Sequence, residues 1–159
     1  MNRFLAGIAV LLLSASALAC SCRESSGNLQ QDVEAAYSHA TLILIGEATA
    51  VHAAEISTSR GDSMPAIKGK GEVTEFTVVQ VWKGNPGKVV TTRIITECCL
   101  CGLSFKTGEK YLLYLSGPDR LGSYATSLCS RTVDAKRAAD DIPILDAIVS
   151  REKMASGKH

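Results

Sequence analysis

The sequence predicts a mainly β protein, an OB-fold-like five-stranded Greek-key barrel with a short helix before it and a second helix packed on it at the C-terminal end. Segments rich in branched and aromatic residues recur along the chain, and clusters of Gly, Pro, Asn and Asp separate them as turns. Their spacing is typical of an all-β barrel and does not suit alternating βαβ units. Five strands flanked by two helices are compatible with a partly open barrel of the OB type.

The first 19 residues have the plan of a secretory signal peptide. Arg3 precedes an apolar run over residues 4–13, and small residues lead to Ala17-Leu18-Ala19 before Cys20. The apolar run is about half the roughly 20 residues that a membrane span needs. We therefore expect residues 1–19 to be removed and the protein to be secreted or periplasmic.

Removal of 19 of the 159 residues leaves 140, which suffice for one domain with a core of its own. We assign this domain to residues 20–133. Residues 134–159 are expected to form the C-terminal helix and a disordered tail.

The elements are predicted in chain order. Asn28, with Gln31 three residues later, resembles a capping arrangement for a short helix, and one face of that helix carries Leu29, Val33, Ala36 and Tyr37. The first strand is expected over residues 41–51, with a bulge or bend at Gly46, and the others over residues 72–82, 89–96, 110–115 and 124–129. Residues 57–71 contain glycines, a proline and mixed charges, which predict a long loop or a loose hairpin.

The C-terminal helix is expected to be capped by Asp141, with Pro143 in its first turn. Its buried stripe would comprise Ile142, Leu145, Ile148 and Val149. Residues 155–159 are expected to be disordered.

Charge and composition exclude some classes of partner. The leader contains one of the 17 basic residues and no acid, so 16 basic residues face 16 acidic ones in the mature chain. Such neutrality, with no run of like charges, argues against nucleic acid. An aromatic content of 5% disfavours an OB-type binder of sugars or nucleic acid.

All six cysteines lie after the leader, and export favours disulfides. Six cysteines allow 15 pairings, so their spacing leaves the connectivity open.

The chain resembles the tissue inhibitors of metalloproteinases and the wider netrin-like module, in the N-terminal inhibitory domain only, as would suit a bacterial member. The specific matches are the Cys20-Ser21-Cys22 start, Cys101-Gly102, and Thr126-Ser127-Leu128-Cys129. Weaker matches are residues 39–48 as first strand, residues 81–84 and residues 109–113. The chain departs from the family at Ser38, where a cysteine is missing, and in the additional Cys98 and Cys99, whose pairing stays open.

The resemblance implies an OB-type barrel with disulfides Cys20–Cys101 and Cys22–Cys129. It also implies inhibition of a zinc metalloendopeptidase, whose metal the amine and carbonyl of Cys20 would chelate in trans, in place of water. The chain is expected to need no cofactor of its own and to be a monomer. The residues expected to contact the protease are Cys20, Ser21, Cys22, Arg23, Leu100, Cys101 and Gly102.

Three alternatives remain. The module could share the fold without inhibiting anything. Ala17-Leu18-Ala19-Cys20 also fits a permissive lipoprotein cleavage site, and lipidation of Cys20 would anchor the protein to a membrane and remove both the chelate and the bridge to Cys101. A metal site at Cys98, Cys99 and Cys101 is disfavoured because no further ligand stands at a suitable spacing. No catalytic arrangement stands out, His39 and His52 are isolated, and we expect no enzyme.

Overall fold

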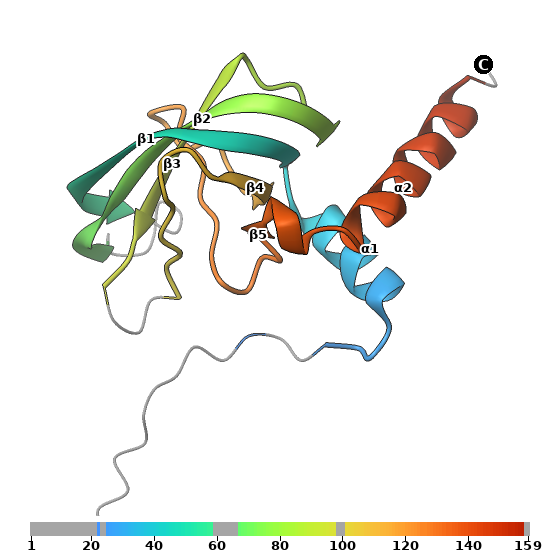
Figure 1. Ribbon diagram of the computed structural model, residues 1–159, viewed down its shortest axis with the longest axis horizontal. Coiled ribbons are helices and arrows are strands. Elements are labelled where there is room, and N and C mark those ends of the chain that lie inside the picture. Colours follow the sequence, from blue (N-terminus) through green and yellow to red (C-terminus); the bar gives the residue numbers. More distant parts are fainter. Residues whose placement is uncertain (1–21, 23–24, 59–66, 98–100, 158–159) are drawn as a thin grey trace, which may run out of the picture.

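The computed structural model describes residues 22, 25–58, 67–97 and 101–157. It shows a mainly β protein with two helices at one end of the sheet (Figure 1). The elements are α1 (Leu29–His39), β1 (Leu42–Thr58), β2 (Ile67–Lys83), β3 (Val89–Ile95), β4 (Lys110–Leu115), β5 (Val133–Asp134), a 3₁₀ helix η1 (Ala135–Arg137) and α2 (Asp141–Ser156).

The five strands form one antiparallel sheet in the order β3-β2-β1-β4-β5. Two single-residue bridges join its ends: Tyr124 pairs in parallel with Thr92 of β3, and Ala125 pairs antiparallel with Ser116, which follows β4. These bridges close the sheet into a barrel in the OB-type order. The predicted strand over residues 124–129 is therefore reduced to these two residues, because the chain turns directly afterwards and the Ser130 N–H bonds to the Ser127 carbonyl at 3.1 Å.

The hairpin of β1 and β2 is longer than predicted. Antiparallel pairing continues to Thr58 and Ile67, so the long-loop interpretation of residues 57–71 is wrong at both ends and the hairpin alternative is confirmed there. The glycines that suggested a loop serve close packing instead. A Cβ on Gly71 would lie 2.1 Å from the Ile94 carbonyl oxygen, so only glycine fits under β3. The predicted irregularity at Gly46 is confirmed as a register shift.

β1 separates two hydrophobic cores because successive side chains of a strand point to opposite faces. Leu42 and Leu44 point into the barrel, where the rings of Phe76 and Tyr111 each pack edge-on near Phe105 with centroids 4.9 Å apart. The other core lies between the barrel and the helices and contains Val33, Tyr37, Ile43, Trp82, Leu112, Tyr114, Leu145 and Ile148. Because β1 lies between two cores, its side chains are apolar on both faces of the strand.

The predicted cap of α1 is confirmed: the Asn28 side chain accepts a hydrogen bond from the Gln31 N–H at 3.2 Å. Val33 and Tyr37 are buried as expected, whereas Leu29 is exposed. His39 is the last residue of this helix and not the start of a strand.

α2 confirms the predicted C-terminal helix but not its cap. Asp140 occupies the N-cap position without a side-chain bond, and Asp141 is the first helical residue. Leu145 and Ile148 are buried, and Ile142 and Val149 are half-buried, as the stripe predicts. The helix continues to Ser156, so the expected disorder from residue 155 is wrong for its first two positions. None of the helices in the described ranges is long and apolar enough to span a bilayer.

Candidate functional site

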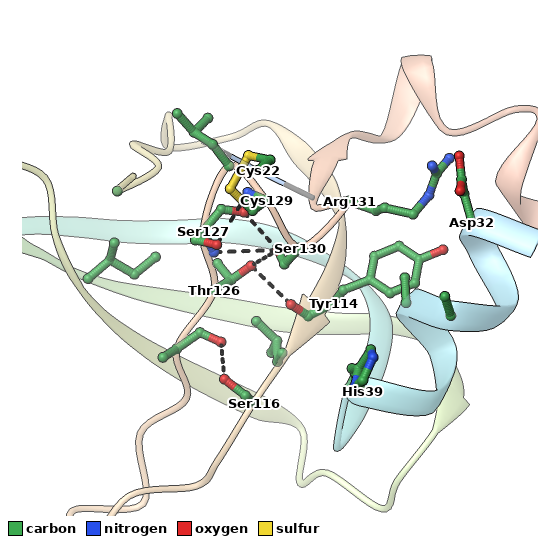
Figure 2. Close-up of a pocket in the computed structure, with 18 of the residues that line it drawn as sticks. Cys22, Asp32, His39, Tyr114, Ser116, Thr126, Ser127, Cys129, Ser130 and Arg131 are labelled. Carbon is green, nitrogen blue, oxygen red and sulfur yellow. Dashed lines mark hydrogen bonds between the residues drawn. A yellow bond between two sulfur atoms is a disulfide. The ribbon is translucent and has the colours of Figure 1, made fainter. Parts of the chain in front are cut away.

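Three chain segments that are distant in sequence meet at one end of the barrel. Cys22, at the N-terminal end, is bonded to Cys129 with their Cα atoms 5.1 Å apart, which confirms this predicted disulfide. The loop that contains Cys129 also meets the segment at Cys101, because the Leu128 N–H donates to the Cys101 carbonyl at 3.0 Å. Figure 2 shows the disulfide beside the hydroxyl side chains of this loop.

Cys101 is disulfide-bonded as well. Cys22 and Cys129 are the other described cysteines and are bonded to each other, so the partner of Cys101 lies outside the described residues. The pair Cys20–Cys101 therefore stays a prediction. The Cys101 backbone has a φ of 54°, a left-handed conformation that is uncommon without glycine.

Gly102 brings the segment after Cys101 against the end of β3. A Cβ at this position would lie 2.1 Å from the Ile95 carbonyl oxygen and 2.8 Å from the Thr96 Cα. The chain that leaves β3 thus returns to touch it, and the loop between them is closed at its base. The Cys-Gly pair seen in the sequence has a physical reason here, since no larger residue permits this contact.

Three hydroxyls hold the loop that contains Cys129. The Thr126 Oγ1 lies 2.6 Å from the Ser130 Oγ and 2.6 Å from the Thr132 Oγ1. The Thr132 hydroxyl also accepts from the Tyr114 N–H at 2.9 Å, and the Ser130 hydroxyl donates to the Ser127 carbonyl at 2.8 Å. The loop is therefore tied to β4 through side chains as well as through the disulfide.

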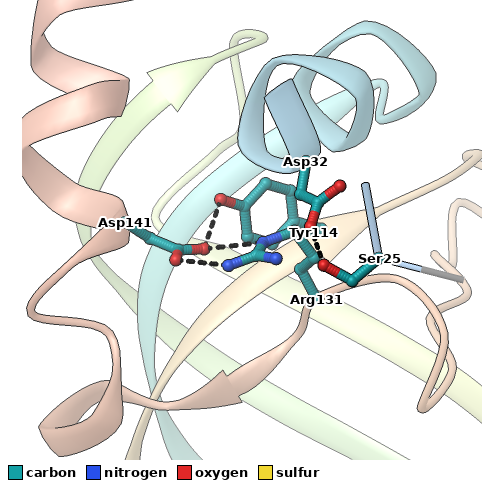
Figure 3. Close-up of polar contacts among 5 residues, drawn as sticks. All are labelled: Ser25, Asp32, Tyr114, Arg131 and Asp141. Atoms are coloured by element: carbon teal, nitrogen blue, oxygen red, sulfur yellow. Dashed lines mark hydrogen bonds and ion pairs between the residues drawn. The ribbon is translucent and has the colours of Figure 1, made fainter. Parts of the chain in front are cut away.

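Arg131 continues this attachment to α2 (Figure 3). Its guanidinium binds both carboxylate oxygens of Asp141, at 3.0 and 2.6 Å, and the Tyr114 hydroxyl donates to the same carboxylate at 3.0 Å. The hydrogen bond to Asp141 raises the pKa of Arg131, while burial, followed by the charge of Asp141, raises the pKa of Tyr114 above its ordinary value. This carboxylate thus joins the loop and the barrel instead of capping its own helix.

The chain after Cys22 is fixed a second time at α1. The Ser25 hydroxyl and the Ser26 N–H, the latter at 2.9 Å, both donate to the carboxylate of Asp32. These bonds, that from Ser25 first, lower the pKa of Asp32. The N-terminal segment is held on one side by the disulfide and on the other by this carboxylate.

A groove of about 1110 Å³ adjoins the three segments. Its walls are α1, the loop that contains Cys129, and β3, and Figure 2 shows Asp32 and His39 on the α1 side. Leu128, which lines it, is 56% exposed. Among the described residues, no group of three or more His, Cys, Asp or Glu side chains is arranged to bind a metal ion.

Of the seven residues expected to contact a protease, Cys22, Cys101 and Gly102 are described and lie together. The remaining four, Cys20, Ser21, Arg23 and Leu100, lie outside the described residues, as do Cys98 and Cys99. Sequence reasoning missed Leu128 and Arg131. The position of Leu128 directly before a predicted disulfide cysteine could have identified it, whereas no local signal marks the pairing of Arg131 with Asp141.

Comparison of the chain with protein-family models gives no match, and comparison with curated proteins gives no significant relative.

Proposed function

We propose that the protein is a secreted inhibitor of zinc metalloendopeptidases, similar to the tissue inhibitors of metalloproteinases, acting through the amine and carbonyl of Cys20. One observation carries this proposal: the chain two residues after Cys20 is bonded to Cys129 at the place where Cys101 and Gly102 also lie. This arrangement fits a terminus presented at a rigid edge of the barrel.

The chemistry of such a terminus suits a catalytic zinc ion. A catalytic zinc keeps one coordination position for water or substrate. An α-amine nitrogen and the carbonyl oxygen of the same residue can replace that water as a five-membered chelate. Because the ordinary pKa of an α-amine is about 8, the proton is lost readily enough near neutral pH for metal binding.

Rigidity supports the same function. A flexible terminus loses conformational entropy when it binds, and each immobilised side chain costs about 0.5–1.5 kcal/mol. Here Cys22 is covalently attached to Cys129, and Ser25 and Ser26 are bonded to Asp32. These attachments reduce the entropy that residues 22, 25 and 26 would lose on binding, which favours affinity.

The first experiment is the intact mass and N-terminal sequence of protein recovered from its native host. A mature chain that begins with unmodified Cys20 supports the proposal. Acyl chains on Cys20, or cleavage elsewhere, would overturn it, because lipidation removes the sulfur from the bridge and blocks the amine. The protein would then be studied as a lipid-anchored or periplasmic netrin-like binding module without inhibitory activity.

The second experiment compares two mature chains, one beginning at Cys20 and one retaining Ala19. The extra residue converts the amine of Cys20 into an amide, which cannot chelate zinc as an amine does, and moves the free amine one residue away to Ala19, while the rest of the chain is the same. Against a panel of zinc metalloendopeptidases with a fluorogenic peptide substrate, we expect the first chain to inhibit at least about a hundredfold better, equivalent to about 2.8 kcal/mol. Equal inhibition by both chains, or none by either, would overturn the mechanism.

A further inference from the structure

Asp32, in the first turn of α1, holds the chain segment that follows Cys22. Its carboxylate accepts one hydrogen bond on each oxygen, from the Ser25 hydroxyl and from the Ser26 N–H, the latter at 2.9 Å. These bonds, that from Ser25 first, and last the charge of Arg131 lower the pKa of Asp32, so the carboxylate is ionised at neutral pH. Figure 3 shows the bond between Ser25 and Asp32 beside the Arg131 guanidinium. The segment is thus attached to α1 by two bonds to one charged side chain.

The residues held by Asp32 belong to a turn that leads directly into the helix. The Gly27 N–H donates to the Ser25 hydroxyl at 3.3 Å, and the Asn28 N–H donates to the Ser26 hydroxyl at 3.1 Å. The Asn28 side chain then caps α1. Because these four residues are bonded to one another, the two bonds to Asp32 fix the turn as a unit against the helix.

This turn is close in the chain to the terminus that would bind zinc. Cys22 lies three residues before Ser25, and Cys20 lies two residues before Cys22. The disulfide to Cys129 fixes the sulfur of Cys22, but the main chain can still rotate about the side-chain bonds that join it to that sulfur. The atoms expected to chelate zinc belong to the main chain of Cys20. Their direction therefore depends on the next fixed point along the chain, which is the turn held by Asp32.

We propose that Asp32 is a positioning residue of the inhibitor, which orients the main chain before Ser25 so that the amine and the carbonyl of Cys20 reach the zinc of the protease together. This role rests on the proposed function, and Asp32 itself touches neither the metal nor the protease. Only molecules with a correctly oriented terminus can bind, so the apparent affinity falls with the fraction of such molecules. The loss should appear in the association rate constant and not in the dissociation rate constant, because the contacts within the bound complex are unchanged.

The test compares the wild type with Asp32→Ala and with a matched control, Glu34→Ala, as mature chains that begin at Cys20 and keep their disulfides. Glu34 lies on the same helix, but its carboxylate binds Gln30 and Arg151 and not the N-terminal segment. Against a zinc metalloendopeptidase that the wild type inhibits, Asp32→Ala should raise the inhibition constant at least about fivefold, equivalent to about 1 kcal/mol, through slower association alone. Glu34→Ala should inhibit as the wild type does. Both variants place a good helix former at a partly exposed position, so each should melt within about 4 °C of the wild type.

A second measurement needs no protease. Exchange of the Ser26 amide, followed by NMR, should be at least about threefold faster in Asp32→Ala than in the wild type, because its N–H has lost its acceptor. Exchange in Glu34→Ala should be unchanged. Ser25→Ala removes the other donor and should also weaken inhibition, but it should add little to Asp32→Ala, because both changes break the same contact.

Other outcomes overturn the role of Asp32 and leave the proposed function standing. These are equal inhibition by the wild type and Asp32→Ala, or unchanged exchange at Ser26. Faster dissociation with unchanged association would mean that Asp32 contacts the protease directly, and an equal loss in Glu34→Ala would assign the effect to the helix as a whole. If the wild type inhibits no zinc metalloendopeptidase of the panel, the proposed function fails and this role fails with it.

Discussion

Removal of the Cys22–Cys129 disulfide should destabilise the protein by an amount that can be calculated. The bridge joins residues 107 apart in the sequence. In the chain-entropy model such a closure reduces the entropy of the unfolded chain by about 16 cal/mol/K, which corresponds to about 4.8 kcal/mol at 25 °C. Both cysteines are exposed, so replacing both with Ala opens no cavity, and the loss should come from the cross-link alone.

The calculated value depends on how Cys101 is paired. If Cys20 is its partner, the N-terminal segment is already joined to residue 101, and the bridge at Cys129 closes a loop of only about 30 residues. The model then gives about 3.6 kcal/mol. With a urea m-value near 2 kcal/mol/M, the double variant Cys22→Ala, Cys129→Ala should lose about 1.8–2.4 M in its unfolding midpoint, measured by circular dichroism.

A matched control perturbs the same loop without opening it. The Ser127 hydroxyl accepts from the Cys129 N–H at 3.2 Å on the surface, and Ser127→Ala should change the unfolding free energy by no more than about 0.5 kcal/mol. A loss below about 1 kcal/mol in the cysteine double variant would refute the reasoning, because it would mean that the bridge does not constrain the unfolded chain.

Three further predictions concern the barrel and its attachments. Asp141→Asn leaves the Arg131 guanidinium without a counter-charge and should lower the free energy of unfolding in urea by about 3 kcal/mol. A loss under 0.5 kcal/mol, roughly that of a surface substitution, would show that water solvates Arg131 in place of the carboxylate. Thr74→Val and Thr92→Val each remove a buried hydroxyl that has no hydrogen-bond partner among the described residues, so each should stabilise by about 1 kcal/mol and raise the melting temperature by about 2–4 °C; a lower melting temperature contradicts this. Gly102→Ala forces a methyl group onto a carbonyl oxygen and should cost about 1–3 kcal/mol and weaken protease inhibition, whereas Gly87→Ala, with no neighbour closer than 3.9 Å, should change neither.

The residue types within each segment predicted β4 and the start of β1 correctly. Residues 110–115 and the start of β1 were recognisable because branched and aromatic residues suit a pleated, buried surface. The cap of α1 was recognisable because it is local as well. Asn28 and Gln31 are only three residues apart, so the hydrogen bond between them does not depend on distant parts of the chain.

The errors arose where distant parts of the chain decide the structure. Gly69 and Gly71 predicted a loop, yet they pack beneath β3, which a strand assignment from local propensity cannot reveal. Asp141 predicted a cap, yet Arg131 and Tyr114 compete for its carboxylate and bind it more strongly, since a charge-assisted bidentate pair exceeds a single cap bond.

The sequence by itself determined the fold class, both helices and the pairing of Cys22 with Cys129, the last through resemblance to a family and not through spacing. Only the tertiary structure decided that Tyr124 and Ala125 join β3 to the end of β4, that Gly102 lies against Ile95, and that Arg131 pairs with Asp141. The reason is physical. Propensity and periodicity depend on neighbours within a few residues, whereas contacts of this kind join segments far apart in the chain, and their geometry exists only once the barrel has closed.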